Sequence, residues 1–200
     1  MHLSHVRREN RAYRKQSMTG ASLIEVLVSI AIASIALLAL AGVNAASVRY
    51  TKMSQYRATA TQLANDIGER MRANKGVPSI PTGFFNGDYD LAIDFGGQAT
   101  PPSLPAQTCS LATSNCTPAQ IAAFDLAQWR QLVRDQLPQG SAYMIRQPAQ
   151  VAMDVWIVWR DPAVASGESL SPVGECPAGL NRNDDTEPES IRCSFFRINL

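Results

Sequence analysis

Two sets of residues in this chain carry side chains suited to specific chemistry: a glutamate beside an apolar segment, and four cysteines. Glu25 immediately precedes residues 26–48, a run of 23 residues without a single Asp, Glu, Lys or Arg. A carboxylate in an apolar medium is costly unless it is neutralised or meets a cation, so a charged partner is expected. Both histidines, His2 and His5, lie at the very start of the chain. A Ser-His or Cys-His nucleophile is therefore excluded from everything that follows, and no catalytic residues are expected.

The cysteines are even in number, which suits disulfide bonds. They are Cys109, Cys116, Cys176 and Cys193. Three pairings are open, and closeness in sequence favours Cys109–Cys116 with Cys176–Cys193. Zinc is the competing interpretation, but there is no C-x-x-C pair and no nearby histidine, so we expect no metal. The acidic stretch 181–187 lacks the spacing of a calcium loop, and no glycine-rich phosphate loop occurs, so no cofactor or small-molecule substrate is expected.

The apolar run must be positioned by an element long enough to span a membrane. About 20 helical residues cross the hydrocarbon core, and 23 uncharged residues exceed that length. Residues 1–20 carry five basic residues against one acidic residue, which predicts a cytoplasmic N-terminus and export of the remainder. All four cysteines then lie in a compartment that permits disulfides. The net charge of the whole chain is only +1, which gives no electrostatic argument for nucleic acid.

Two ordinary interpretations of this N-terminus leave Glu25 unexplained. A secretory signal peptide has an apolar region of about 7–15 residues and then a cleavage site, and this run is too long for that. An uncut signal anchor accounts for the length but assigns no role to the carboxylate.

The segment Gly20-Ala21-Ser22-Leu23-Ile24-Glu25, followed by Val-Leu-Val, resembles the processing signal of type IV prepilins and of type II secretion pseudopilins. The resemblance implies that a prepilin peptidase cuts between Gly20 and Ala21 and then methylates the amino group of Ala21. It implies that Glu25, the fifth mature residue, meets the amino terminus of a neighbouring subunit during filament assembly. Alanine stands here where the family usually has phenylalanine.

The sequence then divides into four parts. Residues 1–20 form the basic leader, residues 21–48 the membrane or filament-core half of a long helix, and residues 49–75 its amphipathic half. The second half carries an apolar stripe at helical spacing, which predicts packing on a globular domain over residues 76–200. The stripe consists of Met53, Tyr56, Ala60, Leu63, Ile67 and Met71.

The globular part is predicted to be α+β and pilin-like, with an antiparallel sheet and a second helix. Thr117 and Pro118 begin that helix, which ends near Leu137 and packs Trp129 in the core. Strands are expected at 142–146, 151–160 and 191–200, and short strands around 89–95. Alternation from 151 to 160 gives an apolar odd-numbered face that should meet the long helix.

The stretch from Cys109 to Arg160 has a cysteine-bearing loop, then Asp125 and Trp129, a Leu137-Pro138-x-Gly140 exit, and a strand ending Val155-Trp156-x-x-Trp159. It resembles the type IV pilus modification protein PilV family of minor pilins.

That resemblance implies a non-enzymatic subunit, held in the inner membrane with its domain in the periplasm and later part of the pilus. Its partners would be the prepilin peptidase/N-methyltransferase, other minor pilins, the major pilin and inner-membrane lipid. Contact with DNA or a host surface would be indirect. The resulting functions are pilus assembly by a priming or tip complex, twitching motility, adhesion and DNA uptake. A type II secretion minor pseudopilin and an uncut, membrane-anchored periplasmic binding domain are the alternatives.

Overall fold

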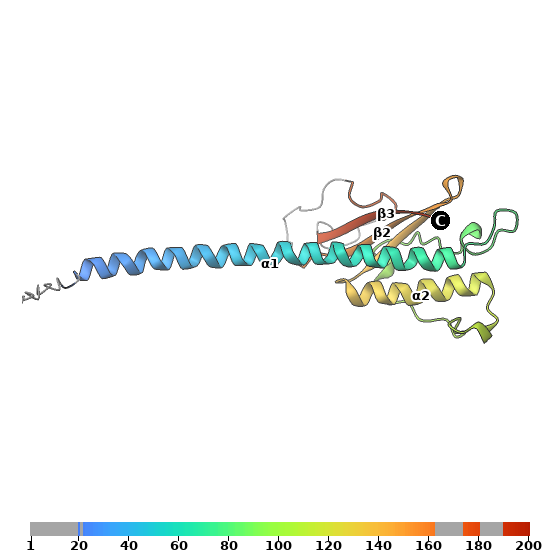
Figure 1. The fold of residues 1–200 in the computed structure, drawn as a ribbon, viewed down its shortest axis with the longest axis horizontal. Helices are drawn as coiled ribbons and strands as arrows, with labels where there is room; N and C mark the ends of the chain where they lie inside the picture. The colour runs from blue at the N-terminus through green and yellow to red at the C-terminus, as the bar shows by residue number, and fades with distance from the viewer. Residues whose placement is uncertain (1–19, 21, 163–173, 181–189) are drawn as a thin grey trace, which may run out of the picture. The chain divides into compact units, whose positions relative to one another are not determined.

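The fold is taken from a computed structural model, which describes residues 20, 22–162, 174–180 and 190–200 (Figure 1). Ala21 and the leader before Gly20 lie outside the described residues. Helix α1 runs from Leu23 to Ala73, a single α-helix of 51 residues as the sequence predicts. The chain forms two compact units, 1–46 and 47–200.

In the first unit, α1 is apolar on every side and its large side chains are exposed. The few hydroxyl groups of this segment are satisfied within the helix. Ser29 Oγ donates to the Glu25 carbonyl at 2.7 Å, and Ser34 Oγ donates to the Ile30 carbonyl at 2.8 Å. Such back-bonding removes the cost of an unpaired hydroxyl in an apolar medium. By length and composition α1 contains a segment that can cross a membrane.

In the second unit, the rest of α1 buries one stripe, as its spacing predicts. Ala60, Leu63, Ile67 and Met71 are buried on the same side of the helix, and Gly68 lies beside them. A Cβ at Gly68 would come within 3.2 Å of the Ile198 side chain. Gly68 therefore allows close approach of α1 to the sheet at that point.

Helix α2 spans Pro118–Gln136. It begins with the predicted cap: the Thr117 side chain accepts from the Gln120 N–H, and the Gln120 side chain accepts from the Thr117 N–H. This reciprocal arrangement satisfies two donors that an uncapped helix would leave free. Trp129 is fully buried, as expected, and its indole N–H donates to the Leu63 carbonyl of α1 at 2.9 Å.

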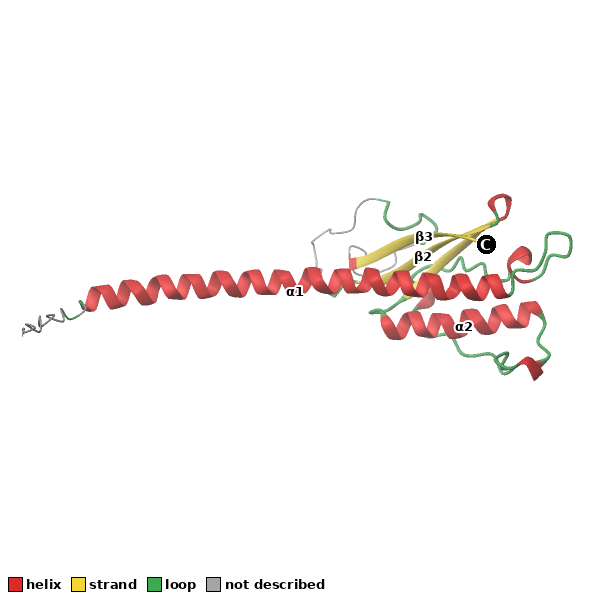
Figure 2. Cartoon of the chain, in the orientation of Figure 1, coloured by secondary structure: helices red, strands yellow, loops and turns green. Residues whose placement is uncertain are grey.

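The sheet has three antiparallel strands in the order β1-β2-β3 (Figure 2). They are β1 (Ser141–Gln147), β2 (Ala152–Arg160) and β3 (Ile191–Asn199). The odd-numbered side chains of β2 belong to the core cluster that contains the α1 stripe, which confirms the predicted face. Val151 does not belong to the strand, because its φ of +49° ends a short 3₁₀ turn. The predicted α+β, pilin-like fold is confirmed.

Both disulfides form as sequence proximity suggested: Cys109–Cys116 and Cys176–Cys193. The short strands expected around 89–95 were wrong. Leu91 makes only an isolated bridge to Met144 of β1. The segment cannot continue as a strand because a turn at Gly87, with φ of +84°, precedes it and a 3₁₀ turn from Gly96 follows it.

Candidate functional site

Glu25 lies in the first turn of α1, at the beginning of the apolar segment. The Ser22 carbonyl accepts from the N–H groups of Glu25 and Val26, so Ser22 leads directly into the helix. Glu25 is exposed and lines an open depression of about 430 Å³ on the helix surface. The other lining residues are Val26, Ser29, Ile30 and Ala33. The depression thus presents one carboxylate in an otherwise apolar or hydroxyl-bearing surface, which suits a cationic group brought by another chain.

The predicted processing site lies just before α1. Gly20 is exposed, immediately ahead of the helix. Ala21, the predicted methylation position, lies outside the described residues. Both remain predictions.

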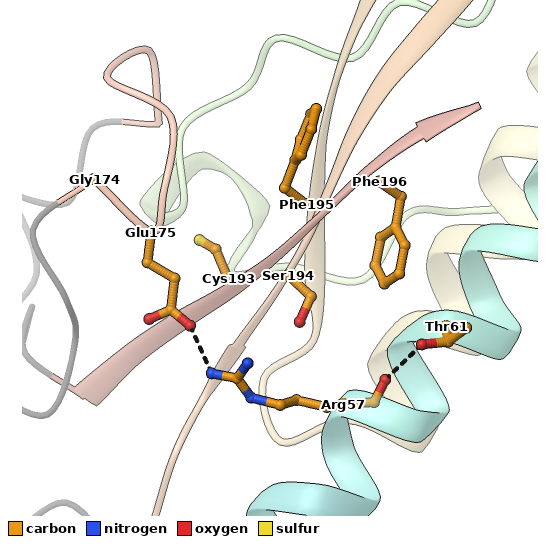
Figure 3. A pocket seen from close by; sticks show the side chains of 8 residues that line it. All are labelled: Arg57, Thr61, Gly174, Glu175, Cys193, Ser194, Phe195 and Phe196. Atoms are coloured by element: carbon orange, nitrogen blue, oxygen red, sulfur yellow. Dashed lines mark hydrogen bonds and ion pairs between the residues drawn. The ribbon is translucent and has the colours of Figure 1, made fainter. Parts of the chain in front are cut away.

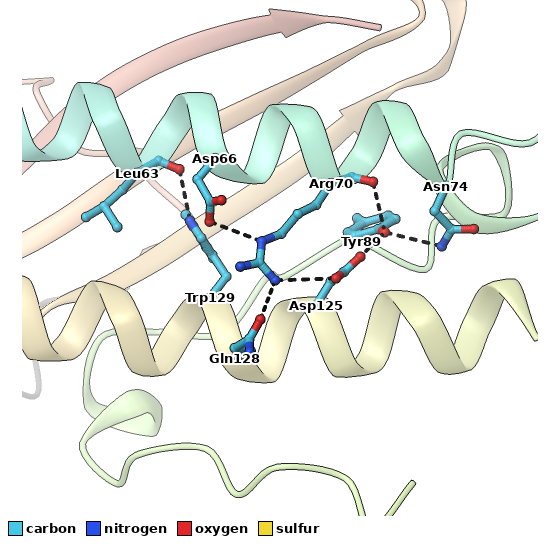
Figure 4. Close-up of polar contacts among 8 residues, drawn as sticks. All are labelled: Leu63, Asp66, Arg70, Asn74, Tyr89, Asp125, Gln128 and Trp129. Atoms are coloured by element: carbon cyan, nitrogen blue, oxygen red, sulfur yellow. Dashed lines mark hydrogen bonds and ion pairs between the residues drawn. The ribbon is translucent and has the colours of Figure 1, made fainter. Parts of the chain in front are cut away.

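Within the second unit, Arg70 of α1 connects the two helices (Figure 4). Its guanidinium lies 3.1 Å from Asp66 on its own helix, 3.4 Å from Asp125 of α2, and 2.7 Å from the Gln128 side-chain oxygen. Charge-assisted hydrogen bonds of this kind fix geometry as well as adding stability. Asp125 and Gln128 interrupt the apolar face of α2 in the sequence, and the structure shows that they do so to receive Arg70.

Tyr89 extends this cluster into the interior. Its hydroxyl donates to the Asp125 carboxylate at 2.8 Å and accepts from the Asn74 side-chain amide at 3.2 Å. Burial raises the pKa of the Tyr89 phenol above its ordinary value, and the neighbouring Asp125 reinforces the rise. The phenol therefore stays protonated and acts as a fixed hydrogen-bond donor. This cluster holds α1, α2 and the loop at Tyr89 together.

A second feature is an open groove of about 490 Å³ between α1 and β3 (Figure 3). Arg57 and Thr61 line it from α1, and four consecutive residues of β3 line the opposite side. Glu175 lies at one end, where it accepts from Arg57 at 3.1 Å and from Arg192 at 2.9 and 3.1 Å. The adjacent Cys176–Cys193 bond ties the segment bearing Glu175 to β3. Sequence reasoning missed this triad, because its members are distant along the chain.

The face of the sheet away from α1 carries a row of aromatic side chains, one from each strand. Tyr143, Trp156 and Phe195 are partners in the strand register. The ring centroids lie 6.0 Å apart for Tyr143 and Trp156, and 4.9 Å apart for Trp156 and Phe195. Such cross-strand aromatic pairs stabilise a sheet. Phe195, at the end of the row, is 49% exposed.

Next to this row, Asp154 of β2 is buried and paired. Arg197 of β3 donates to both of its carboxylate oxygens, at 2.7 and 2.8 Å, and the Gln147 amide donates at 3.0 Å. Arg197 holds the pKa of the Asp154 carboxyl below its ordinary value, although burial acts in the opposite direction. The pair is strand-to-strand and fixes the register of β2 and β3.

Within the described residues, no three His, Cys, Asp or Glu side chains are grouped so as to hold a metal ion. Comparison with protein-family models, with curated proteins and with solved structures finds no significant match to this chain.

Proposed function

We propose that this chain is a minor pilin that takes part in type IV pilus assembly. One observation carries the proposal: the Gly20-to-Glu25 signal leads into a helix whose first turn holds Glu25 and whose next six turns are apolar on every side. A helix that is apolar all round needs lipid or other helices around it. The α+β domain and its two disulfides suit an exported subunit.

In this proposal the subunit is held in the inner membrane before assembly, with its N-terminus in the cytoplasm and the residues after about 49 in the periplasm. The prepilin peptidase removes residues 1–20 and methylates Ala21. The apolar half of α1 then leaves the lipid and packs among the helices of other minor pilins and the major pilin, in a priming or tip complex. The pattern from Cys109 to Arg160 supports the PilV family within this class.

Glu25 provides the recognition step. Inside a helical bundle its carboxylate is removed from water, which is unfavourable by several kcal/mol unless a cation accompanies it. The amino group that cleavage creates at Ala21 of a neighbouring subunit is such a cation. An uncleaved neighbour lacks that group, so only processed subunits would satisfy Glu25.

The N-terminus of the protein isolated from native membranes tests the proposal. Intact mass and N-terminal peptide mapping should show a chain that starts at Ala21 and carries one additional methyl group. A chain that starts at Met1 would remove the pilin proposal and favour the uncut, membrane-anchored periplasmic domain. A type II secretion pseudopilin would give the same mass, and the fraction in which the protein occurs, sheared pili or the secretion apparatus, separates these two.

A further inference from the structure

The two edges of the sheet differ, and the hydrogen-bond pattern of β3 shows how. The Asp161 N–H donates to the Ser190 carbonyl, and the Leu200 N–H donates to the Val151 carbonyl. Residue pairs along an antiparallel ladder alternate between hydrogen-bonded and non-hydrogen-bonded. These two bonds therefore show which residues of β3 are hydrogen-bonded to β2. Even-numbered residues of β3 point their main-chain groups toward β2. The odd-numbered residues Cys193, Phe195 and Arg197 point theirs away from the sheet.

The opposite edge, on β1, is closed. Leu91 exchanges two main-chain hydrogen bonds with Met144, at 3.0 and 2.9 Å. The Gln98 side chain donates to the Ala142 carbonyl at 2.8 Å and accepts from its N–H at 3.3 Å. The Arg146 N–H donates to the Asp90 carboxylate at 2.9 Å. Three successive outward-facing residues of β1 are thus paired by residues of the preceding loop, which prevents another strand from adding there.

The edge of β3 carries no such cover in the described part of the chain. Arg72 of α1 donates to the Asn199 carbonyl at 3.0 Å, which closes one end. The Cys176–Cys193 bond and Glu175 flank the other end. Between these ends, no described residue forms a hydrogen bond with the main chain of Phe195 or Arg197. An unpaired N–H and C=O on alternate residues is the pattern that an extended polypeptide matches.

The groove of Figure 3 lies along this same edge. Cys193, Ser194, Phe195 and Phe196 form one of its sides, and Arg57 and Thr61 of α1 form the other. Arg57 lines the groove and is paired with Glu175, whereas Arg72 lies at the Asn199 end of β3 and is paired with Glu69; their side chains are 51% and 44% exposed. The space beside the unpaired edge is therefore open, and guanidinium groups flank it.

We propose that the β3 edge binds an extended segment of a different polypeptide, which adds a fourth strand to the sheet. Main-chain bonds to Phe195 and Arg197 would hold it. On one face its side chains would cover Phe195, whose ring is half exposed, and these should be apolar. On the other face they would enter the groove beside Arg57 and Thr61, where small polar side chains fit.

A second copy of this chain fits the edge poorly, and this step rests on the proposed function. Two β3 edges paired antiparallel about a twofold axis would run the two α1 helices in opposite directions. Subunits anchored in one membrane have their helices in the same direction, so this pair is excluded. A head-to-tail pair would use the β1 edge of the next copy, which Gln98, Leu91 and Asp90 already occupy. The partner is therefore another anchored, exported polypeptide with a free strand.

Amide hydrogen exchange of the purified full chain in detergent tests the open edge without a filament. The N–H groups of Phe195 and Arg197 should exchange about a hundredfold faster, or more, than those of Ser194 and Phe196, which bond to β2. Residue-level detection by NMR is required, because neighbouring residues are compared. Equal protection of all four amides would mean that the chain covers its own edge, and would overturn the proposal.

Photo-crosslinking in the native cell tests the partner. Thr61, exposed in the groove, is replaced by benzoylphenylalanine, and the crosslinked peptide is identified by mass spectrometry. The proposal expects a peptide from an extended segment of another helix-anchored exported protein. A crosslink to this chain's own residues, to a second copy, or to nothing would overturn it. The N-terminus is mapped in the same sample, so that a start at methylated Ala21 with no crosslink counts against the edge alone and leaves the pilin proposal standing.

A matched pair of variants links the crosslink to the edge. Phe195→Pro removes the outward N–H and costs no bond to β2, whereas Phe195→Ala removes the same ring and keeps the N–H. The proline variant should give a crosslink yield about tenfold below that of the alanine variant, since both lack the ring and only the proline also blocks strand addition. Equal yields in the two variants would overturn the proposal. If Phe195→Pro does not fold, Arg197→Pro against Arg197→Ala repeats the comparison two residues along.

Discussion

At the scale of single residues, the Asp154–Arg197 pair gives the domain an acid-sensitive contact. Asp154 is buried, and its two carboxylate oxygens together accept three hydrogen bonds, two of them from Arg197. Its pKa in the folded state lies below that of an unfolded chain. Such a group contributes stability above the ordinary carboxyl pKa, and this contribution is lost as the pH falls through the depressed value.

Asp154→Asn should therefore weaken the dependence of stability on acid. The free energy of unfolding of the variant, measured by urea unfolding at pH 7 and pH 3, should change less between the two pH values than that of the wild type. At pH 7 the variant should be the less stable protein, because the ion pair with Arg197 is gone. Asp135→Asn, an exposed change on α2, serves as the control and should keep the wild-type pH dependence. An Asp154→Asn protein with an unchanged pH dependence would contradict the assignment.

At the scale of elements, the two disulfides differ in how they stabilise the domain. Cys109–Cys116 closes a loop of 7 residues' separation, whereas Cys176–Cys193 closes 17 and ties a segment to β3. That segment brings Glu175 to Arg192 and places Leu180 in the second, smaller core cluster with Val158. Loss of the longer link therefore removes both a constraint on the unfolded chain and packing in the folded one.

Replacing Cys176 and Cys193 together by serine should lower the free energy of unfolding by about 3 kcal/mol from chain entropy, with a further loss from the displaced segment. The double change at Cys109 and Cys116 should cost less, since its loop is shorter and lies outside the two core clusters. Denaturant unfolding of the two double variants under one set of conditions makes the comparison. Equal losses would indicate that the segment around Glu175 and Leu180 adds nothing beyond loop closure.

The elements also show what local pattern can and cannot predict. The α1 stripe, the Thr117 cap and the odd face of β2 follow from periodicities and spacings that each lie within one element. The contacts that join two elements do not follow from such local patterns. In the sequence, Asp125 only interrupts an apolar face of its helix, and its role is clear once the structure places Arg70 opposite it. The strand predicted around 89–95 failed for the same reason. There, the side chains of Asp90 and Gln98 form the hydrogen bonds to β1 that the main chain of a strand would form. The spacing of apolar residues gives no sign of such side-chain bonds.

At the scale of the whole molecule, the two units have surfaces suited to different surroundings. The first presents apolar side chains in every direction and suits lipid or a bundle of helices. The second has its own core, its own polar clusters and an edge suited to a neighbour. In the two proposals above, the chain would contact other subunits in two separate ways, through Glu25 with the apolar helix and through the β3 edge. A substitution that weakens one of these two contacts should leave the other contact intact.

Substitution of Glu25 tests the proposed contact through the apolar helix. Glu25→Ala should leave cleavage after Gly20 unchanged, because the residues at the cut are kept, but the mature subunit should be missing from sheared pili. Loss of one member of a buried ion pair costs about 3–5 kcal/mol, enough to reduce incorporation by more than a hundredfold. Glu25→Gln keeps the size and removes the charge, and it should fail equally if the charge is what matters. Ser29→Ala, one turn along, removes only a hydroxyl bonded within the helix and should assemble normally. Wild-type amounts of Glu25→Ala in sheared pili would show that the carboxylate plays no part in assembly.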